Sequence, residues 1–129
     1  MTLDLHQDAI VSVLKTYFDG LYYADSRRLS QALHPDARYI NTVNGEYVNI
    51  PTDTYFPIVD SRTPPAESGQ VRKDEILSIE IGGPNMAFAK VKMAMMDRVY
   101  TDFLTLLLEG GRWSIIAKVF HYDLEKEGE

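Results

Sequence analysis

Residues 100–122 read YTDFLTLLLEGGRWSIIAKVFHY and form the last long hydrophobic stretch of the chain. Two runs rich in β-favouring residues, Tyr100–Leu108 and Trp113–Tyr122, flank the pair Gly110-Gly111. A Gly-Gly pair supplies the positive φ angles that a tight hairpin turn requires. The stretch therefore predicts a long β-hairpin with these two glycines in its turn.

The turn also predicts which residues of the hairpin share a face. The expected pairs are Leu108 with Trp113, Leu106 with Ile115, Leu104 with Ala117, Asp102 with Val119 and Tyr100 with His121. Because side chains alternate along a strand, these ten residues are expected to face inward. The outer face should then carry Thr101, Thr105, Glu109, Arg112, Ser114 and Lys118, interrupted by the apolar Phe103, Leu107, Ile116 and Phe120.

The rest of the chain predicts helices first and further strands later. Helices are expected at residues 4–24, 27–33 and about 52–59, and strands at 37–41, 46–50, 71–81 and 86–96, with a loop at 61–69. The first helix rests on apolar residues at three- and four-residue spacing. Asp25-Ser26 can cap the second helix, and Thr52 or Asp53 the third.

These elements fit a single domain over residues 1–129. A chain of this length can bury one hydrophobic core, and antiparallel strands with a polar outer face must cover their inner face with the helices. The sequence therefore predicts an α+β fold with an ordered core at about residues 4–122. The charged tail, Asp123–Glu129, is expected to fray.

Composition narrows the classes of partner. No apolar run approaches the roughly 18 residues that cross a bilayer, so no membrane span is expected. Cysteine is absent, and the N-terminal residues include acids where a signal peptide carries basic residues, so we expect a cytoplasmic protein. The net charge of -6 works against binding to the phosphates of nucleic acids.

Three segments that follow the long helix carry a family signature. They read ALHPDARY at 32–39, YTDFLTLL at 100–107 and GRWSIIAKVFH at 111–121. Together they resemble the nuclear transport factor 2-like superfamily and, more narrowly, its putative lumazine-binding family, near the SnoaL-like cyclases. The resemblance covers about residues 4–122. It implies a cystatin-like roll, in which a cone-shaped curved sheet wraps around the N-terminal helices and leaves a cavity at its open end.

The resemblance leaves the activity open, since this fold serves isomerases, cyclases, dehydratases and ligand carriers. Many relatives pair through the outer sheet face, so a homodimer would explain the apolar residues there. Aligned with ketosteroid isomerases, Tyr17 takes the position of the catalytic tyrosine. Asn41 stands where those isomerases have their proton-abstracting aspartate, and an amide cannot act as that base.

The expected inward face brings Asp102 and His121 together as diagonal neighbours. A carboxylate that orients an imidazole is the usual arrangement of a general base. One interpretation therefore makes His121 the base, Asp102 its orienting group and Tyr17 or Tyr39 a proton donor. In the other interpretation, both residues are structural: Asp102 is a buried acid satisfied by its surroundings, and His121 lies at the end of the sheet.

Aromatic and methionine side chains predict a pocket for a small apolar or aromatic molecule between helices and sheet. Its expected lining is Tyr17, His34, Tyr39, Tyr55, Met93, Trp113 and His121. The histidines lack the spacing of metal ligands and no glycine-rich loop opens a helix, so neither a metal nor a cofactor is expected. A small-molecule binder, a cofactor-free acid/base enzyme and a protein-interaction module remain as alternatives.

Overall fold

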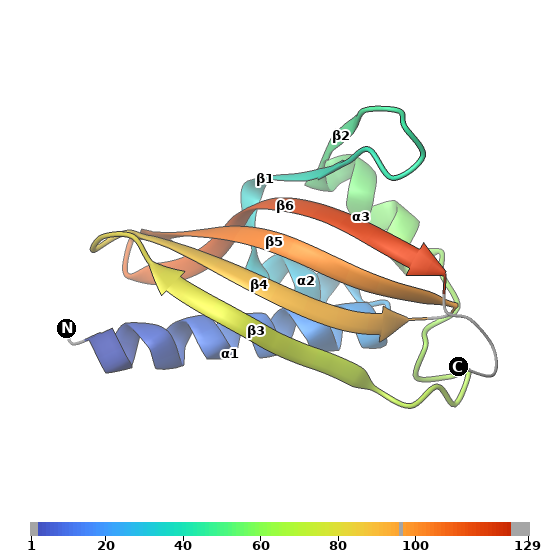
Figure 1. The fold of residues 1–129 in the computed structure, drawn as a ribbon, viewed down its shortest axis with the longest axis horizontal. Helices are drawn as coiled ribbons and strands as arrows, with labels where there is room; N and C mark the ends of the chain where they lie inside the picture. The colour runs from blue at the N-terminus through green and yellow to red at the C-terminus, as the bar shows by residue number, and fades with distance from the viewer. Residues whose placement is uncertain (1–2, 96, 125–129) are drawn as a thin grey trace.

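The computed structural model describes residues 3–95 and 97–124 of the chain (Figure 1). Its elements, in order, are α1 (Leu3–Tyr22), α2 (Ser26–Ala32), β1 (Leu33–Asn41), β2 (Val48–Pro51), α3 (Thr52–Asp60), β3 (Lys73–Ile81), β4 (Met86–Met95), β5 (Arg98–Glu109) and β6 (Arg112–Leu124). The predicted α+β class is confirmed. The bounds of the three helices lie within a few residues of those expected.

The strands form one curved, unclosed six-stranded sheet in the order β2-β1-β6-β5-β4-β3. Neighbouring strands are antiparallel, except that β1 and β6 run parallel. In Figure 1 the helix α1 runs along the sheet, while α3 lies beside β1 and β2. The core fills the space between the sheet and the helices, as expected for two layers that cover each other's apolar faces.

The helices form where their sequence patterns predict them. Ile10, Leu14, Tyr17 and Leu21 lie on one face of α1 and are buried. The Asp25 carboxylate accepts hydrogen bonds from the backbone N–H groups of residues 27 and 28 and so caps α2. None of the helices in the described part of the chain has the length and apolar character needed to cross a bilayer.

The start of α3 differs from the prediction. Its N-cap is Pro51, which forms no side-chain cap hydrogen bond, so the expected cap by Thr52 or Asp53 is wrong. The Thr52 hydroxyl instead donates to the Pro35 carbonyl oxygen over 3.1 Å and joins α3 to β1. At the other end of the chain, Asp123 and Leu124 belong to β6, and the rest of the predicted tail lies outside the described residues.

The hairpin of β5 and β6 has the predicted turn but not the predicted register throughout. Gly110 and Gly111 adopt positive φ angles of 59° and 79°. The predicted pairs nearest the turn, Leu108 with Trp113 and Leu106 with Ile115, are confirmed. A β-bulge follows, because Thr105 pairs with Ala117 and leaves Ile116 as an extra residue in β6.

The bulge shifts every later pair by one residue. Leu104 pairs with Lys118, Asp102 with Phe120 and Tyr100 with Tyr122, so the three predicted pairs beyond the bulge are wrong. Since one residue of shift moves a side chain to the other face, Lys118 and Phe120 are buried while Val119 and His121 are exposed. The expected inward positions of Val119 and His121 and the expected outward positions of Lys118 and Phe120 are therefore wrong.

Candidate functional site

The inner face of the hairpin buries a carboxylate against the first helix. Asp102 of β5 is only 1% exposed, and the Tyr17 hydroxyl of α1 donates a 2.5 Å hydrogen bond to its Oδ2 atom. The other carboxylate oxygen, Oδ1, is buried without a hydrogen-bond partner. A buried acceptor without a partner carries a free-energy cost, so this oxygen can accept a hydrogen bond from a water in the adjoining void or from a polar group of a ligand.

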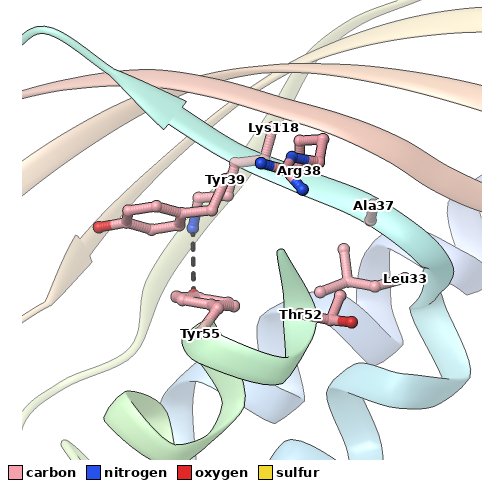
Figure 2. Close-up of a pocket in the computed structure, with 7 residues that line it drawn as sticks. All are labelled: Leu33, Ala37, Arg38, Tyr39, Thr52, Tyr55 and Lys118. Carbon is pink, nitrogen blue, oxygen red and sulfur yellow. Dashed lines mark hydrogen bonds between the residues drawn. The ribbon is translucent and has the colours of Figure 1, made fainter. Parts of the chain in front are cut away.

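A buried cation lies beside this acid. Lys118 of β6 is 5% exposed, and its Nζ atom donates a 3.4 Å hydrogen bond to the Tyr55 hydroxyl, drawn as the dashed line in Figure 2. The same Nζ atom lies 5.0–5.5 Å from the ring centroids of Tyr17, Tyr39, Tyr55 and Phe120. Four aromatic faces at this range stabilise a desolvated ammonium. Lys118 is thus held in an aromatic cage.

Two elements far apart in the sequence complete the cage. Tyr39 of β1 and Tyr55 of α3 stack with ring centroids 4.5 Å apart, and Tyr39 also contacts the Phe120 ring at 4.7 Å. Figure 2 shows the two tyrosine rings and Lys118 converging from β1, α3 and β6. The position of α3 therefore decides whether the ammonium is covered.

Two small voids meet at Lys118. One is lined by Leu33, Ala37, Arg38, Tyr39, Thr52, Tyr55 and Lys118, as drawn in Figure 2. The other is lined by Leu21, Tyr39, Tyr55, Arg62, Met93, Met95, Tyr100, Asp102 and Lys118. In each void, the space that the centre of a water molecule can occupy is about 10 Å³. Each void therefore has room for about one water. A larger ligand has to displace the Tyr39 or Tyr55 ring that the two voids share.

The protonation states follow from burial and neighbouring charge. Burial lowers the pKa of Lys118, but the oxygens of Tyr55 and Asp102 outweigh that effect, so its pKa lies above the ordinary 10.5. Burial, and then the Asp102 carboxylate, raise the pKa of Tyr17 well above the ordinary 10.0. At neutral pH the cluster therefore combines an ammonium with a neutral tyrosine that donates to the carboxylate.

The structure brings several of the predicted site residues together. Tyr39, Tyr55, Met93 and Asp102 line one void, and Tyr17 reaches it through its hydrogen bond to Asp102. Three of them, Tyr39, Tyr55 and Met93, were expected as pocket lining from their residue types alone. The strand pairing and the position of α3 give them their common location.

The remaining predicted residues lie elsewhere. His121 does not contact Asp102: its side chain is 61% exposed, and its Nε2 atom lies 3.0 Å from Asp123 Oδ1. His34 Nε2 lies 2.9 Å from Glu109 Oε1, next to the hairpin turn. Trp113, also next to the turn, donates from its indole N–H to His6 Nδ1 over 3.1 Å. None of these three residues lines the two voids.

Sequence reasoning missed Lys118 and Arg62. A signal for Lys118 was present in the residues after the bulge, which read AKVFHY. One face of this segment carries Lys118, Phe120 and Tyr122, and the other carries Ala117, Val119 and His121. The face with two large aromatic rings buries more apolar area, so it is the better inward face, even though it carries the lysine.

This arrangement has the parts for binding and for proton transfer. The unbonded Asp102 Oδ1 can accept a hydrogen bond or a proton, and the Lys118 ammonium can donate to a carbonyl or enolate oxygen.

Asn41, which takes the position of the isomerase aspartate, forms a local contact: its amide oxygen accepts from the Val43 backbone N–H over 3.1 Å. No group of three or more potential metal-ligating side chains occurs within residues 3–95 and 97–124.

The chain is similar to several known proteins over most of its length. The aldolase FrzH of Cladobotryum sp is 27% identical over 116 residues, which cover 88% of this chain and 89% of FrzH. A nuclear transport factor 2-like protein of unknown function from Shewanella baltica is 27% identical, with a TM-score of 0.84 and coverage of 95% of this chain and 98% of that chain. A similar protein of unknown function from Methylobacillus flagellatus is 26% identical, with a TM-score of 0.81 and 95% coverage of each chain.

These structural neighbours share the nuclear transport factor 2-like fold. The sequence profile of the family described as putative lumazine-binding matches residues 5–121, which run from α1 through most of β6. The match thus includes the helix that supplies Tyr17 and the two strands that supply Asp102 and Lys118. This chain belongs to the putative lumazine-binding family.

Proposed function

We propose that this chain is a cytoplasmic protein that binds a small, flat, largely aromatic molecule at the cage around Lys118. The polar edge of the ligand lies between Asp102 Oδ1 and Lys118 Nζ, and its ring lies against Tyr39 and Tyr55. The observation that carries the proposal is the buried, unbonded carboxylate oxygen beside a caged ammonium. A lumazine ring has carbonyl oxygens and N–H groups on its edge, which match a cation and an acceptor.

Entry of such a ring requires α3 to move away from β1. Besides ring stacking and the burial of Tyr55 and Val59, three further contacts hold α3 there. The Tyr55 hydroxyl accepts from Lys118 Nζ, Thr52 donates to the Pro35 carbonyl oxygen, and the Asp60 carboxylate accepts from the Ser26 backbone N–H and hydroxyl over 3.0 and 2.7 Å. Each such bond contributes a net stability of about 1 kcal/mol, so a ligand that replaces the Tyr39–Tyr55 contact can offset their loss. Binding is therefore expected to involve a rearranged α3.

Isothermal titration with lumazine tests the proposal. The wild type should bind, and Asp102→Asn and Lys118→Met should each lose at least about tenfold in affinity, because each removes one polar contact of the ring edge. The matched controls are Asp36→Asn and His121→Asn, which change exposed side chains and should bind as the wild type does. Absence of binding to the wild type, or unchanged affinity in Asp102→Asn, would contradict the proposal.

A second candidate function is cofactor-free acid/base catalysis at the same site. It is favoured by the unbonded Asp102 Oδ1 and by the similarity to an aldolase over most of the chain. Asp102 would take a proton from a carbon next to a carbonyl group, and Lys118 would stabilise the enolate oxygen. His121 has no part in this scheme, because it lies on the opposite face of the sheet.

Deuterium uptake distinguishes catalysis from binding alone. An aryl 1,3-diketone in D₂O exchanges the hydrogens between its carbonyls, and ¹H NMR follows the exchange. A catalyst should accelerate it in proportion to protein concentration, and Asp102→Asn should abolish that acceleration while His121→Asn retains it. If the wild type and Asp102→Asn exchange at the same rate, Asp102 is not acting as a base.

We further propose that two copies pair through the outer face of the sheet. Phe103, Val119 and Met86 expose 46%, 43% and 49% of their surface there, and Phe88 packs edge-on against Phe103 with ring centroids 5.6 Å apart. Sedimentation should show a dimer that Phe103→Lys dissociates, because a charge would be buried at the contact. A monomeric wild type would leave this apolar face available to another protein, and so favour an interaction module.

A further inference from the structure

One cation at the second void is not neutralised by the protein. Arg62 follows α3, its side chain is partly buried, and it lines the void that also contains Asp102 and Lys118. Within residues 3–95 and 97–124, Arg62 forms no ion pair, and the nearby Asp60 carboxylate is occupied by Ser26. Arg72, in contrast, pairs with Asp19 and Asp74.

The charges around this void do not balance. Its lining includes two cations, Arg62 and Lys118, and one carboxylate, Asp102. The protein as a whole has a net charge of -6, so the positive charge of this void is opposite in sign to the net charge of the chain. Burial chiefly raises the pKa of Tyr39, although Lys118 and Arg62 act in the opposite direction, so this tyrosine adds no charge to the lining at pH 7. One positive charge remains uncompensated.

We propose that the ligand is a flat ring compound carrying one carboxylate, which Arg62 binds at the edge of the void. This inference rests on the proposed binding function and specifies the class of ligand. The ring edge opposite the carboxylate contacts Asp102 and Lys118, while Arg62 supplies a planar pair of N–H donors that matches a carboxylate. A single uncompensated charge is balanced by a monoanion, which favours a carboxylate over a phosphate dianion.

The position of Arg62 also links binding of the carboxylate to the movement of α3 that admits the ring. Arg62 is separated from α3 only by Ser61, whose backbone N–H donates to the Pro57 carbonyl oxygen over 3.1 Å at the helix end. A displacement of α3 that opens the Tyr39–Tyr55 stack therefore carries Arg62 with it. A carboxylate bound to Arg62 can hold α3 in its displaced position while the ring occupies the space between the tyrosines.

A matched ligand set tests the inference: lumazine, lumazine-6-carboxylate and lumazine-6-carboxamide, titrated calorimetrically against the wild type. The carboxylate and the carboxamide have nearly the same shape and differ in charge. The carboxylate should bind about tenfold or more tightly than the carboxamide, as expected for a charge-assisted pair at a partly buried site. High salt should reduce this preference.

Variants of Arg62 test whether this residue causes the preference for the carboxylate over the carboxamide. Arg62→Gln should remove the preference for the carboxylate and leave lumazine affinity nearly unchanged, whereas Arg62→Lys should retain part of it. The control Arg27→Gln makes the same change of charge at an exposed position of α2 and should retain the full preference. Thermal melts should show all three variants folded, because Arg62 is not part of the hydrophobic core.

The outcomes separate the two proposals. Equal affinity of the wild type for carboxylate and carboxamide would overturn the carboxylate inference and leave ring binding standing. A preference that persists in Arg62→Gln would also overturn it. If none of the three compounds binds the wild type, the proposed lumazine-type binding function fails, and the inference fails with it.

Discussion

The buried pair Asp102 and Lys118 allows a quantitative prediction about stability. The two residues are diagonal neighbours on the inner face, since Leu104 pairs with Lys118 and Asp102 with Phe120. Diagonal side chains across an antiparallel pair are about 7 Å apart, and at an effective dielectric constant of about 20 two opposite unit charges then attract by about 2 kcal/mol. The carboxylate and the ammonium should therefore depend on each other energetically without touching.

Asp102→Asn and Lys118→Met should each reduce the free energy of unfolding by about 3 kcal/mol, because each leaves a buried charge without its counter-charge. The double variant should lose less than the sum of the two, by a coupling energy of about 2 kcal/mol. Urea unfolding can be followed through the fluorescence of Trp113, the one tryptophan of the chain, which is buried in the folded state.

The exposed pair of His121 and Asp123 is the control for this cycle. Its atoms lie closer together, at 3.0 Å, but both side chains are largely exposed. Solvent screening should make His121→Asn and Asp123→Asn additive. If the Asp102 and Lys118 variants were also additive within about 0.5 kcal/mol, the two buried groups would not be electrostatically coupled, and the argument for a charged site would fail.

Three further predictions follow from single contacts. Tyr17→Phe should cost about 2 kcal/mol at pH 7, because Asp102 loses its hydrogen bond. The raised pKa of Tyr17 gives its full stabilisation below the unfolded pKa near 10.0, and this stabilisation is lost as pH rises through the folded pKa. In urea titrations at alkaline pH, the free energy of unfolding should therefore fall more steeply with pH for the wild type than for Tyr17→Phe. Gly20→Ala should destabilise by about 1–2 kcal/mol despite the better helix propensity, because the new Cβ would lie 2.7 Å from Leu29 side-chain atoms; a rise in Tm would contradict this. Arg112→Met should lower Tm by a few degrees, because Arg112 donates to the Gln31 carbonyl oxygen over 2.5 Å at the end of α2; an unchanged melting curve would show that this bond adds nothing.

The sequence was sufficient for most of the fold. The helix α1 and the face that it buries both follow from the spacing of Ile10, Leu14, Tyr17 and Leu21. The Gly110-Gly111 turn fixes the hairpin pairs next to it. The parallel pairing of β1 with β6 is different, because it depends on how the chain returns to the sheet after β5, and no local pattern encodes that.

The site could be predicted only in part, for a physical reason. Residue types identify Tyr39, Tyr55 and Asp102 as candidates, but their convergence requires the exact register of β6. Alternation extended past Thr105 places His121 beside Asp102, whereas the bulge places His121 on the exposed face. Arg62 has no signal at all in the sequence, because the role proposed for it depends on the absence of a nearby partner and on the position of α3.

The buried acid depends on the bulge at Ile116 for its counter-charge. Without the extra residue, Val119 would lie opposite Asp102, and Lys118 would point outward from the sheet. The carboxylate would then keep the Tyr17 hydrogen bond but have no cation near it, and a buried charge without a counter-charge costs several kcal/mol. With the extra residue, the ammonium enters the space that Tyr39 and Tyr55 close. A single irregularity in β6 thus supplies the counter-charge that makes Asp102 tolerable in the core, and it places the Lys118 ammonium on the same inner face as the unbonded Oδ1.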